Sequence, residues 1–218
     1  MPFWTTQRIR EALGGHNSPI LRPKLERANN ACYEMALGTE AFITSMTGTT
    51  QTFEPGRQVR IPPGQFGLLI TDEEICLPLN ILAFISIKAS KKMRGLVNVS
   101  GFHVDPGFRG RLKFSVYNAG SEAIVLDVGE RLFPIWFYEL PEDNEDEYNG
   151  RHKGQMTITS EDAMRLQGEV ASPAALKKEI DEIRSTVANW KAATTGALIT
   201  AVATALAAIV AAVVKLGK

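Results

Sequence analysis

The sequence predicts a mainly β domain, either a barrel or a sandwich, followed by one long C-terminal helix. Short apolar runs separated by glycine and proline recur through 42–140, as they do in proteins built from many short strands. After residue 172 the apolar residues change to helical spacing, and a run without charged residues follows. These two patterns divide the chain into a β domain and a helical tail.

The elements of the β domain follow from local patterns. Residues 6–13 predict a short helix, which Gly14 and Gly15 stop. The segment 62–64, Pro-Pro-Gly, supplies a turn between two apolar segments. We expect strands at 57–61, 66–70, 81–87, 124–129 and 132–137. Short strands at this spacing favour a compact β fold.

Changes in composition divide the chain into four regions. The β domain is expected at 1–140. Residues 141–171 read as an acidic linker and then a basic, glycine-punctuated arm. Residues 172–191 predict an amphipathic or coiled-coil helix, and residues 192–214 predict a transmembrane helix.

The helical tail has a clear start signal. Ser172 is expected at the N-cap and Pro173 at the first helical position. Apolar residues then alternate at four- and three-residue steps, which is typical of a coiled-coil seam: Leu176, Ile180, Ile183, Val187 and Trp190. The same pattern fits an amphipathic helix that lies on the β domain, so both interpretations stay open.

The run 192–214 carries no charged residue, and Lys191 and Lys215 flank it. About 23 residues at ~1.5 Å per residue span a hydrocarbon core of ~30 Å. Small residues suited to close helix contact recur every four positions: Gly196, Thr200, Thr204, Ala208 and Ala212. We expect a membrane anchor with the β domain in the cytoplasm, at the inner face. Because alanine is only weakly apolar, a buried helix in an oligomer core is the alternative.

Composition argues against several other classes of protein. The chain has 24 basic and 24 acidic residues and a formal net charge of zero, so we expect no nucleic-acid partner. Cys32 and Cys76 offer neither a disulfide framework nor the ligand spacing of a metal site, and they suit a reducing cytoplasm. We expect no signal peptide, and neither a phosphate-loop nor a dinucleotide-binding motif occurs.

The most informative segment is 101–120. Asp105 precedes a Pro-Gly turn, Phe108 follows it, and an alternating strand then runs to Asn118. Such a turn exposes a carboxylate at the mouth of a β structure, although a carboxylate before Pro-Gly also commonly caps its own turn. His103 lies two residues earlier, so both side chains would face one side of an extended segment. One interpretation is that His103 and Asp105 form a catalytic pair. The alternative is that His103 is an ordinary packed or surface residue.

Several landmarks in order make the chain resemble the dCTP deaminase/trimeric dUTPase family over residues 5–155. The match is best at 104–110, Val-Asp-Pro-Gly-Phe-Arg-Gly. The others are the segments 17–20 and 31–38, the Pro-Gly at 63–64, the Thr-x-Glu at 71–73, the Leu-Pro at 77–78 and the Lys-Ala-Ser at 88–90. The resemblance implies a distorted jelly-roll subunit that forms a homotrimer, with nucleotide pockets between the subunits.

The resemblance also implies roles for individual residues. Asp105 would position or deprotonate an attacking water, and Phe108 would stack on a pyrimidine. Lys88 and Ser90 would contact phosphates, although Lys88 lacks the forked geometry of the arginine usual in the family. A triphosphate would bring Mg²⁺ with it. No further metal site is expected.

Base recognition and the closing arm complete the implied site. The strand from Lys113 to Ser115 would read the pyrimidine, and Tyr148, Lys153 and Gln155 resemble remnants of an arm that folds over the nucleotide. In the deaminase branch a glutamate shuttles protons at the position that matches Ser115. A serine hydroxyl cannot serve as that acid and base at neutral pH.

These residues predict a hydrolase of pyrimidine deoxynucleoside triphosphates. Asp105 is present and the deaminase glutamate is replaced, which favours dUTP over dCTP. The alternative is a catalytically silent module that senses deoxynucleotides, or only trimerises, and signals to a membrane helix. The apolar tail favours this alternative.

Overall fold

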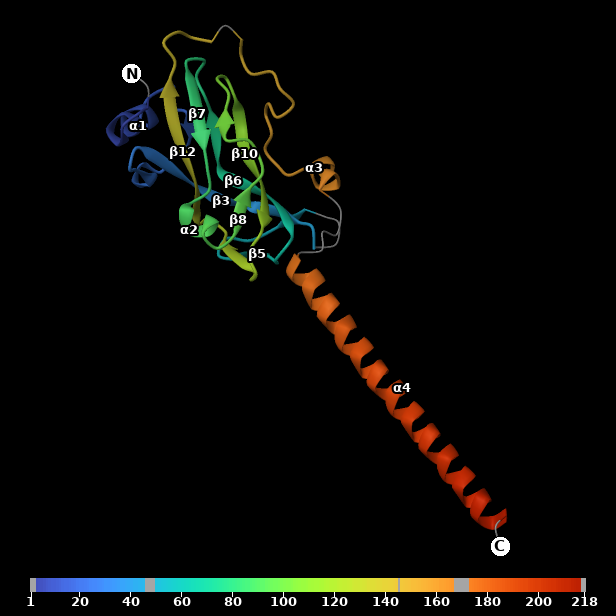
Figure 1. The fold of residues 1–218 in the computed structure, drawn as a ribbon. Helices are drawn as coiled ribbons and strands as arrows, with labels where there is room; N and C mark the ends of the chain where they lie inside the picture. Colours follow the sequence, from blue (N-terminus) through green and yellow to red (C-terminus); the bar gives the residue numbers. More distant parts are fainter. Residues whose placement is uncertain (1–2, 46–49, 145, 167–172, 217–218) are drawn as a thin grey trace. The chain divides into compact units, whose positions relative to one another are not determined.

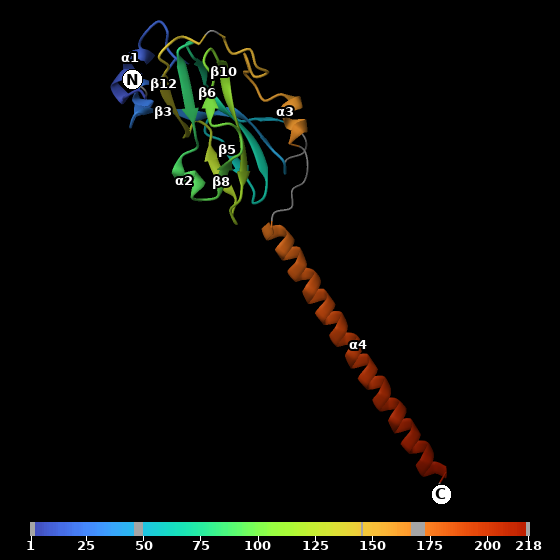
Figure 2. The same cartoon turned by 45° about the horizontal axis from the view of Figure 1, so that its top comes forward.

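The computed structural model describes residues 3–45, 50–144, 146–166 and 173–216. The chain divides into two compact units, Met1–Ser172 and Pro173–Lys218. The first is mainly β and the second is the helix α4 (Pro173–Leu216) (Figure 1). Figure 2 shows the β unit from a second direction.

The β unit is built on one ten-stranded sheet in which every pair of neighbouring strands is antiparallel. Its main path runs β8-β10-β6-β3-β12-β7-β9, and β1, β2 and β4 pair at its sides. The strands are β1 (Ile20–Leu21), β2 (Ala28–Asn29), β3 (Cys32–Ile43), β4 (Gln51–Thr52), β6 (Phe66–Cys76), β7 (Ile81–Ile85), β8 (Leu96–Asn98), β9 (His103–Val104), β10 (Arg109–Asn118) and β12 (Arg131–Glu139). A separate ribbon pairs β5 (Gln58–Ile61) with β11 (Ile124–Asp127).

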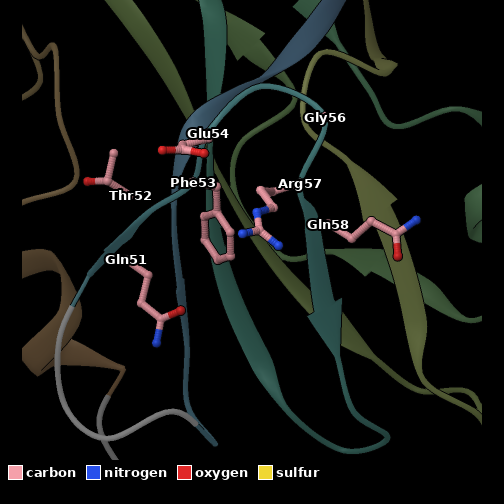
Figure 3. Close-up of a pocket in the computed structure, with 7 residues that line it drawn as sticks. All are labelled: Gln51, Thr52, Phe53, Glu54, Gly56, Arg57 and Gln58. Carbon is pink, nitrogen blue, oxygen red and sulfur yellow. The ribbon is translucent and has the colours of Figure 1, made fainter.

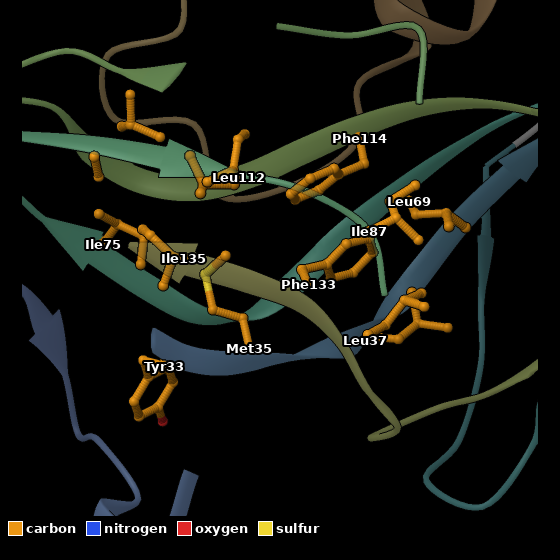
Figure 4. Packing of buried hydrophobic residues seen from close by; sticks show 14 of the residues in the cluster. Tyr33, Met35, Leu37, Leu69, Ile75, Ile87, Leu112, Phe114, Phe133 and Ile135 are labelled. Atoms are coloured by element: carbon orange, nitrogen blue, oxygen red, sulfur yellow. The ribbon is translucent and has the colours of Figure 1, made fainter. Parts of the chain in front are cut away.

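The large sheet curls around its own core. β6 and β3 lie between β10 and β12 in the sheet, yet Phe114 of β10 stacks on Phe133 of β12 with ring centroids 4.0 Å apart. Such a contact requires the sheet to close on itself. Figure 4 shows these rings among the surrounding aliphatic side chains. Residues of β10 alternate between buried and partly exposed, so one face of the strand fills the core and the other faces outward.

The N-terminal helix is confirmed at its expected bounds, α1 (Thr6–Leu13). Thr5 caps it, because its side chain accepts a hydrogen bond from the backbone N–H of Arg8 at 3.2 Å. Ile9 and Leu13 form its buried face. Two short helical segments lie elsewhere in this unit, η1 (Leu25–Arg27) and α2 (Ala89–Lys92).

The sequence prediction differs from the structure at several elements, including the short strands β1, β2, β4 and β8, which it did not include. The first long strand, β3, begins at Cys32 and not near residue 42, and the short strands β1 and β2 precede it. The strand β3 is buried on both faces and shows no alternation for a sequence pattern to detect. A helix, α3 (Ser160–Arg165), lies inside the segment expected to be linker. It is too short to show helical periodicity.

A buried ion pair ties the N-terminal segment to the sheet. The guanidinium of Arg27 donates to the carboxylate of Glu73, and both side chains are almost completely buried. The backbone N–H of Ala36 donates to the second oxygen of Glu73 at 2.9 Å. Burial raises the pKa of Glu73, although these two donors act in the opposite direction.

The helix α4 contains both the expected seam and the apolar run. Ser172, the expected N-cap, lies outside the described residues, and Pro173 is the first residue of the helix. By length and composition the described segment Leu176–Ile209 is a candidate membrane span, and its most apolar 18-residue window has a mean hydropathy of 1.8. All five seam residues are exposed: Leu176, Ile180, Ile183, Val187 and Trp190.

Candidate functional site

A pocket of about 330 Å³ lies beside the turn that precedes β10. It is lined by β10, by the segment that leads into it, by part of the region 148–155 and by α3. Six of the residues expected at the site line it: Asp105, Phe108, Lys113, Ser115, Tyr148 and Gln155. Residues far apart in the sequence therefore meet at one hollow.

Asp105 lies at the rim of this pocket with its carboxylate accessible. Its side chain is 49% exposed, and the ring Nε2 of His103 lies 3.4 Å from Oδ1. Within the described part of the chain, no backbone N–H donates to the carboxylate. The turn is closed instead by the backbone, because the N–H of Phe108 donates to the carbonyl of Asp105 at 3.2 Å. Asp105 and His103 thus face one side, as their spacing predicted.

The turn depends on Gly107. Its φ is +76°, in the left-handed region that favours glycine. A Cβ at this position would also lie 3.0 Å from the backbone nitrogen of Tyr148. The glycine therefore allows the turn and the arm to approach closely.

The ring of Phe108 is not the open stacking surface that the sequence predicted. Phe108 is only 5% exposed, and its ring packs against Tyr148 with centroids 5.6 Å apart. Little of the Phe108 ring is therefore left for a pyrimidine. Tyr148 is half-buried and also packs against the hydrophobic core.

Lys113 and Asp162 form a nearly buried ion pair in the pocket wall. The ammonium of Lys113 lies 2.5 Å from Oδ2 of Asp162, with side chains 11% and 15% exposed. Thr159 caps α3 and also donates to Asp162 from its hydroxyl and its backbone N–H. Burial alone would raise the pKa of Asp162, but the hydrogen bonds from Lys113 and Thr159 outweigh it and lower the pKa to about 2.

The arm is held against the start of β10. The N–H of Gly154 donates to the carbonyl of Arg109 at 2.8 Å, and the N–H of Arg111 donates to the carbonyl of Gln155 at 2.8 Å. Gly110, with φ of +139°, makes this approach possible, because a Cβ there would lie 2.6 Å from the Gln155 carbonyl oxygen. The side-chain amide of Gln155 donates to the Arg111 carbonyl at 2.8 Å and its oxygen lies 3.0 Å from His152 Nδ1. Both the nitrogen and the oxygen of the Gln155 side-chain amide therefore interact within the protein, and Gln155 helps to hold the arm against β10.

Three expected nucleotide contacts lie outside the pocket lining. Lys88 pairs with Glu34 at 2.7 Å, and Ser90 is exposed on α2. Lys153 pairs with Glu147 at 3.2 Å and is not among the lining residues. One protomer does not bring these three groups to Asp105.

The sequence did not identify Asp162 or His152 as pocket residues, although both line it. His152 is exposed. Asp162 stands three residues after Thr159, which is a capping-box spacing that predicts a helix start. That signal was available, but it says nothing about contact with Lys113.

A second hollow, of about 720 Å³, lies along residues 51–58 (Figure 3). It is lined by Gln51, Thr52, Phe53, Glu54, Gly56, Arg57 and Gln58. None of the residues expected to contact a nucleotide lies there. The pocket beside Asp105 is therefore the candidate site.

Nothing in the described ranges groups three or more histidine, cysteine, aspartate or glutamate side chains as a metal site would require. A divalent cation that enters with a triphosphate does not need such a cage. Mg²⁺ keeps several waters and is commonly bound through phosphates and one or two carboxylates.

Acid should weaken the docking of α3. Because the pKa of Asp162 is lowered, its ionised form stabilises the fold at pH values above 3.8, the ordinary pKa of an aspartate. This contribution is lost as pH falls toward about 2. We expect Asp162→Asn to lower the free energy of unfolding by about 1–3 kcal/mol at pH 6. Urea titrations should show this difference shrinking between pH 4 and pH 2. Asp143→Asn, at an exposed position, should show no such trend, and an equal trend for both variants would contradict the assignment.

Comparison with known proteins points in the same direction as this geometry. A family model described as dCTP deaminase-like matches residues 15–140, more than half of the chain. A dCTP deaminase of Pyrococcus horikoshii is 31% identical over 133 residues, which cover 61% of this chain and 83% of that protein. A dCTP deaminase of Thermococcus gammatolerans is 32% identical over 133 residues, which cover 61% and 82%.

A solved structure supports the fold. The 2′-deoxycytidine 5′-triphosphate deaminase of Agrobacterium tumefaciens matches with a TM-score of 0.53 and 16% sequence identity. The match covers 63% of this chain and 48% of that one. The expected fold class, a mainly β dUTPase-like domain with a long C-terminal helix, is confirmed, and so is the family resemblance inferred from the motifs.

Proposed function

Because this chain belongs to the dCTP deaminase-like family, we propose that its pocket binds a pyrimidine deoxynucleoside triphosphate and that Asp105 promotes hydrolysis of this ligand. One observation carries the proposal. The Asp105 carboxylate stands half-exposed at the rim of the pocket and accepts no backbone hydrogen bond within the described residues. A carboxylate in that state is free to hold a water molecule.

Asp105 would act as the base toward that water. Proton transfer to a positioned carboxylate raises the nucleophilicity of the water as it attacks the α-phosphorus. The bond from the α-phosphorus to the oxygen that bridges it to the β-phosphorus breaks, and pyrophosphate leaves. His103 lies 3.4 Å away and restricts the orientation of the carboxylate. The Mg²⁺ belongs to the substrate complex, where it offsets the charge of the phosphate oxygens.

We infer a homotrimer because Lys88 and Ser90 do not line the pocket of their own protomer. In a trimer, these residues of one protomer would complete the pocket of its neighbour. Lys88 would then exchange its ion pair with Glu34 for a phosphate oxygen. Its point charge would hold the phosphate without the forked geometry of arginine.

The proposed preference for dUTP over dCTP rests on Ser115. It lies on β10 in the pocket lining, at the position where the family resemblance expects the deaminase glutamate. A serine hydroxyl does not exchange protons with a ring amine at neutral pH. Deamination of dCTP therefore lacks its acid and base, whereas hydrolysis at Asp105 does not need that group.

A second candidate function is a deoxynucleotide sensor without turnover. The observation that favours it is the apolar helix Leu176–Ile209, which qualifies as a membrane span by length and composition. We propose that this helix tethers the β unit to the cytoplasmic face of a membrane. Binding in the pocket would then be signalled to the membrane.

Incubation of the full-length protein in detergent with Mg²⁺ and either dUTP or dCTP separates these functions. We expect dUMP from dUTP and no deaminated product from dCTP, as measured by chromatography. Thermal stabilisation by dUTP without product would support the sensor. Neither product nor stabilisation would contradict both.

A further inference from the structure

The exposed seam of α4 has a defined heptad arrangement. Ile180 and Val187 occupy the a positions, and Leu176, Ile183 and Trp190 occupy the d positions. Their exposed fractions are 43–69%, so α4 by itself does not bury this apolar face. A helix in water normally buries such a face against a partner.

The same heptad continues beyond Trp190 into the apolar run. Its next five a and d positions are all small: Thr194, Ala197, Ala201, Thr204 and Ala208. Most large side chains of this part lie at b and f positions on the other face, Ile199, Val202, Leu206 and Ile209, and Leu198 lies at an e position beside the contact. Helices that associate in lipid place small residues at their contact, and here the larger residues lie mainly outside it.

The threonines of this face are satisfied within their own helix. Thr194 donates its hydroxyl to the Trp190 carbonyl at 3.0 Å, and Thr204 donates to the Thr200 carbonyl at 2.9 Å. No hydroxyl at these two positions needs water or a polar partner. The face can therefore close against another helix without an unmet donor.

Charges beside the seam specify the direction of the partner. The e positions are all basic, Lys177, Arg184 and Lys191, whereas Glu179 occupies a g position. In parallel helices a g residue meets the e residue five positions further along the partner, which pairs Glu179 with Arg184. In antiparallel helices the e residues face one another, and these cations would repel.

We propose that α4 binds two further copies of itself in parallel and in register, through a single face that extends from Leu176 to Ala208. Isoleucine at both an a and a d position favours coiled coils of three or more helices over coiled coils of two. The face begins as a coiled coil in water and continues as a small-residue contact in the apolar segment. The occupant of the uncovered seam is the same helix of neighbouring chains.

Disulfide capture in the full-length protein tests the proposal. Leu176→Cys places a thiol at one end of the seam, and Ser185→Cys places one at an f position on the outer face. Under mild oxidation we expect Leu176→Cys chains to cross-link several-fold more than Ser185→Cys chains. The unmodified chain, with Cys32 and Cys76, sets the background.

The direction is tested by mixing variants. Parallel helices join Leu176→Cys to itself, whereas antiparallel helices would join it to Trp190→Cys. A dominant 176–190 disulfide, or equal cross-linking of Ser185→Cys, would overturn the proposal. The Ser185→Cys control also separates a specific face from mere proximity of the tails.

Charge exchange tests the pairing independently in the Leu176→Cys background. Glu179→Lys and Arg184→Glu should each reduce cross-linking several-fold, and the combined exchange should restore it. Glu182→Lys, on the outer face, is the matched control and should leave cross-linking unchanged. Failure of the combined exchange to restore cross-linking would overturn the parallel assignment.

Discussion

Asp105→Asn should reduce dUTP hydrolysis by about 10²–10⁴-fold while leaving the fold intact, since removal of a positioned general base costs this much. The amide cannot accept the proton of the attacking water. The side chain is half-exposed and accepts no backbone hydrogen bond in the described residues, so its exchange should not disturb the turn. Initial rates of dUMP formation at saturating dUTP measure the effect.

The control for this variant is Asp143→Asn, at an exposed position outside the pocket lining. It makes the same chemical change and should keep the wild-type rate. The melting temperatures of both variants should match that of the wild type. Asp105→Asn with a rate within a few-fold of wild type would remove Asp105 from the mechanism.

Glu73→Gln should destabilise the β unit by about 3–5 kcal/mol, because it leaves the Arg27 guanidinium buried without its counter-charge. Both side chains are buried, at 7% exposure for Arg27 and 6% for Glu73. The pair joins the segment before β2 to the middle of β6. Urea denaturation, followed by tryptophan fluorescence to which the buried Trp4 contributes, measures the loss.

Two comparisons make this result specific to the buried pair. The double variant Arg27→Met with Glu73→Leu should recover most of the stability, since an apolar pair of similar volume needs no counter-charge. Glu161→Gln should change stability by less than about 1 kcal/mol, because its ion pairs with Arg151 and Arg165 are exposed. Equal losses for Glu73→Gln and Glu161→Gln would contradict the account.

The sequence predicted those features that depend on short stretches of chain. The turn at Asp105 carries its own signal, because proline and glycine at adjacent positions define its geometry. The helix α1 has a threonine cap on one side and two glycines on the other. The strand β10 alternates, as the sequence pattern up to Asn118 predicted, and one of its faces is buried.

Features that depend on contacts between residues far apart along the chain could not be predicted from the sequence. Phe108 follows the turn as a stacking residue would, but Tyr148 of the arm packs on it and leaves it 5% exposed. Asp162 lies 49 residues from Lys113 along the chain, and only the docking of α3 brings them together. The strand β3 was missed because both of its faces are buried.

Equilibrium binding of a non-hydrolysable dUTP analogue tests the central claim, that the pocket beside Asp105 holds a pyrimidine deoxynucleotide. Ser115→Phe fills this pocket, whereas Ser121→Phe adds the same ring at an exposed turn outside its lining. Calorimetric titration should show binding to the wild type and to Ser121→Phe, and loss of binding to Ser115→Phe. Equal binding to both variants, or no binding to the wild type, would contradict the account.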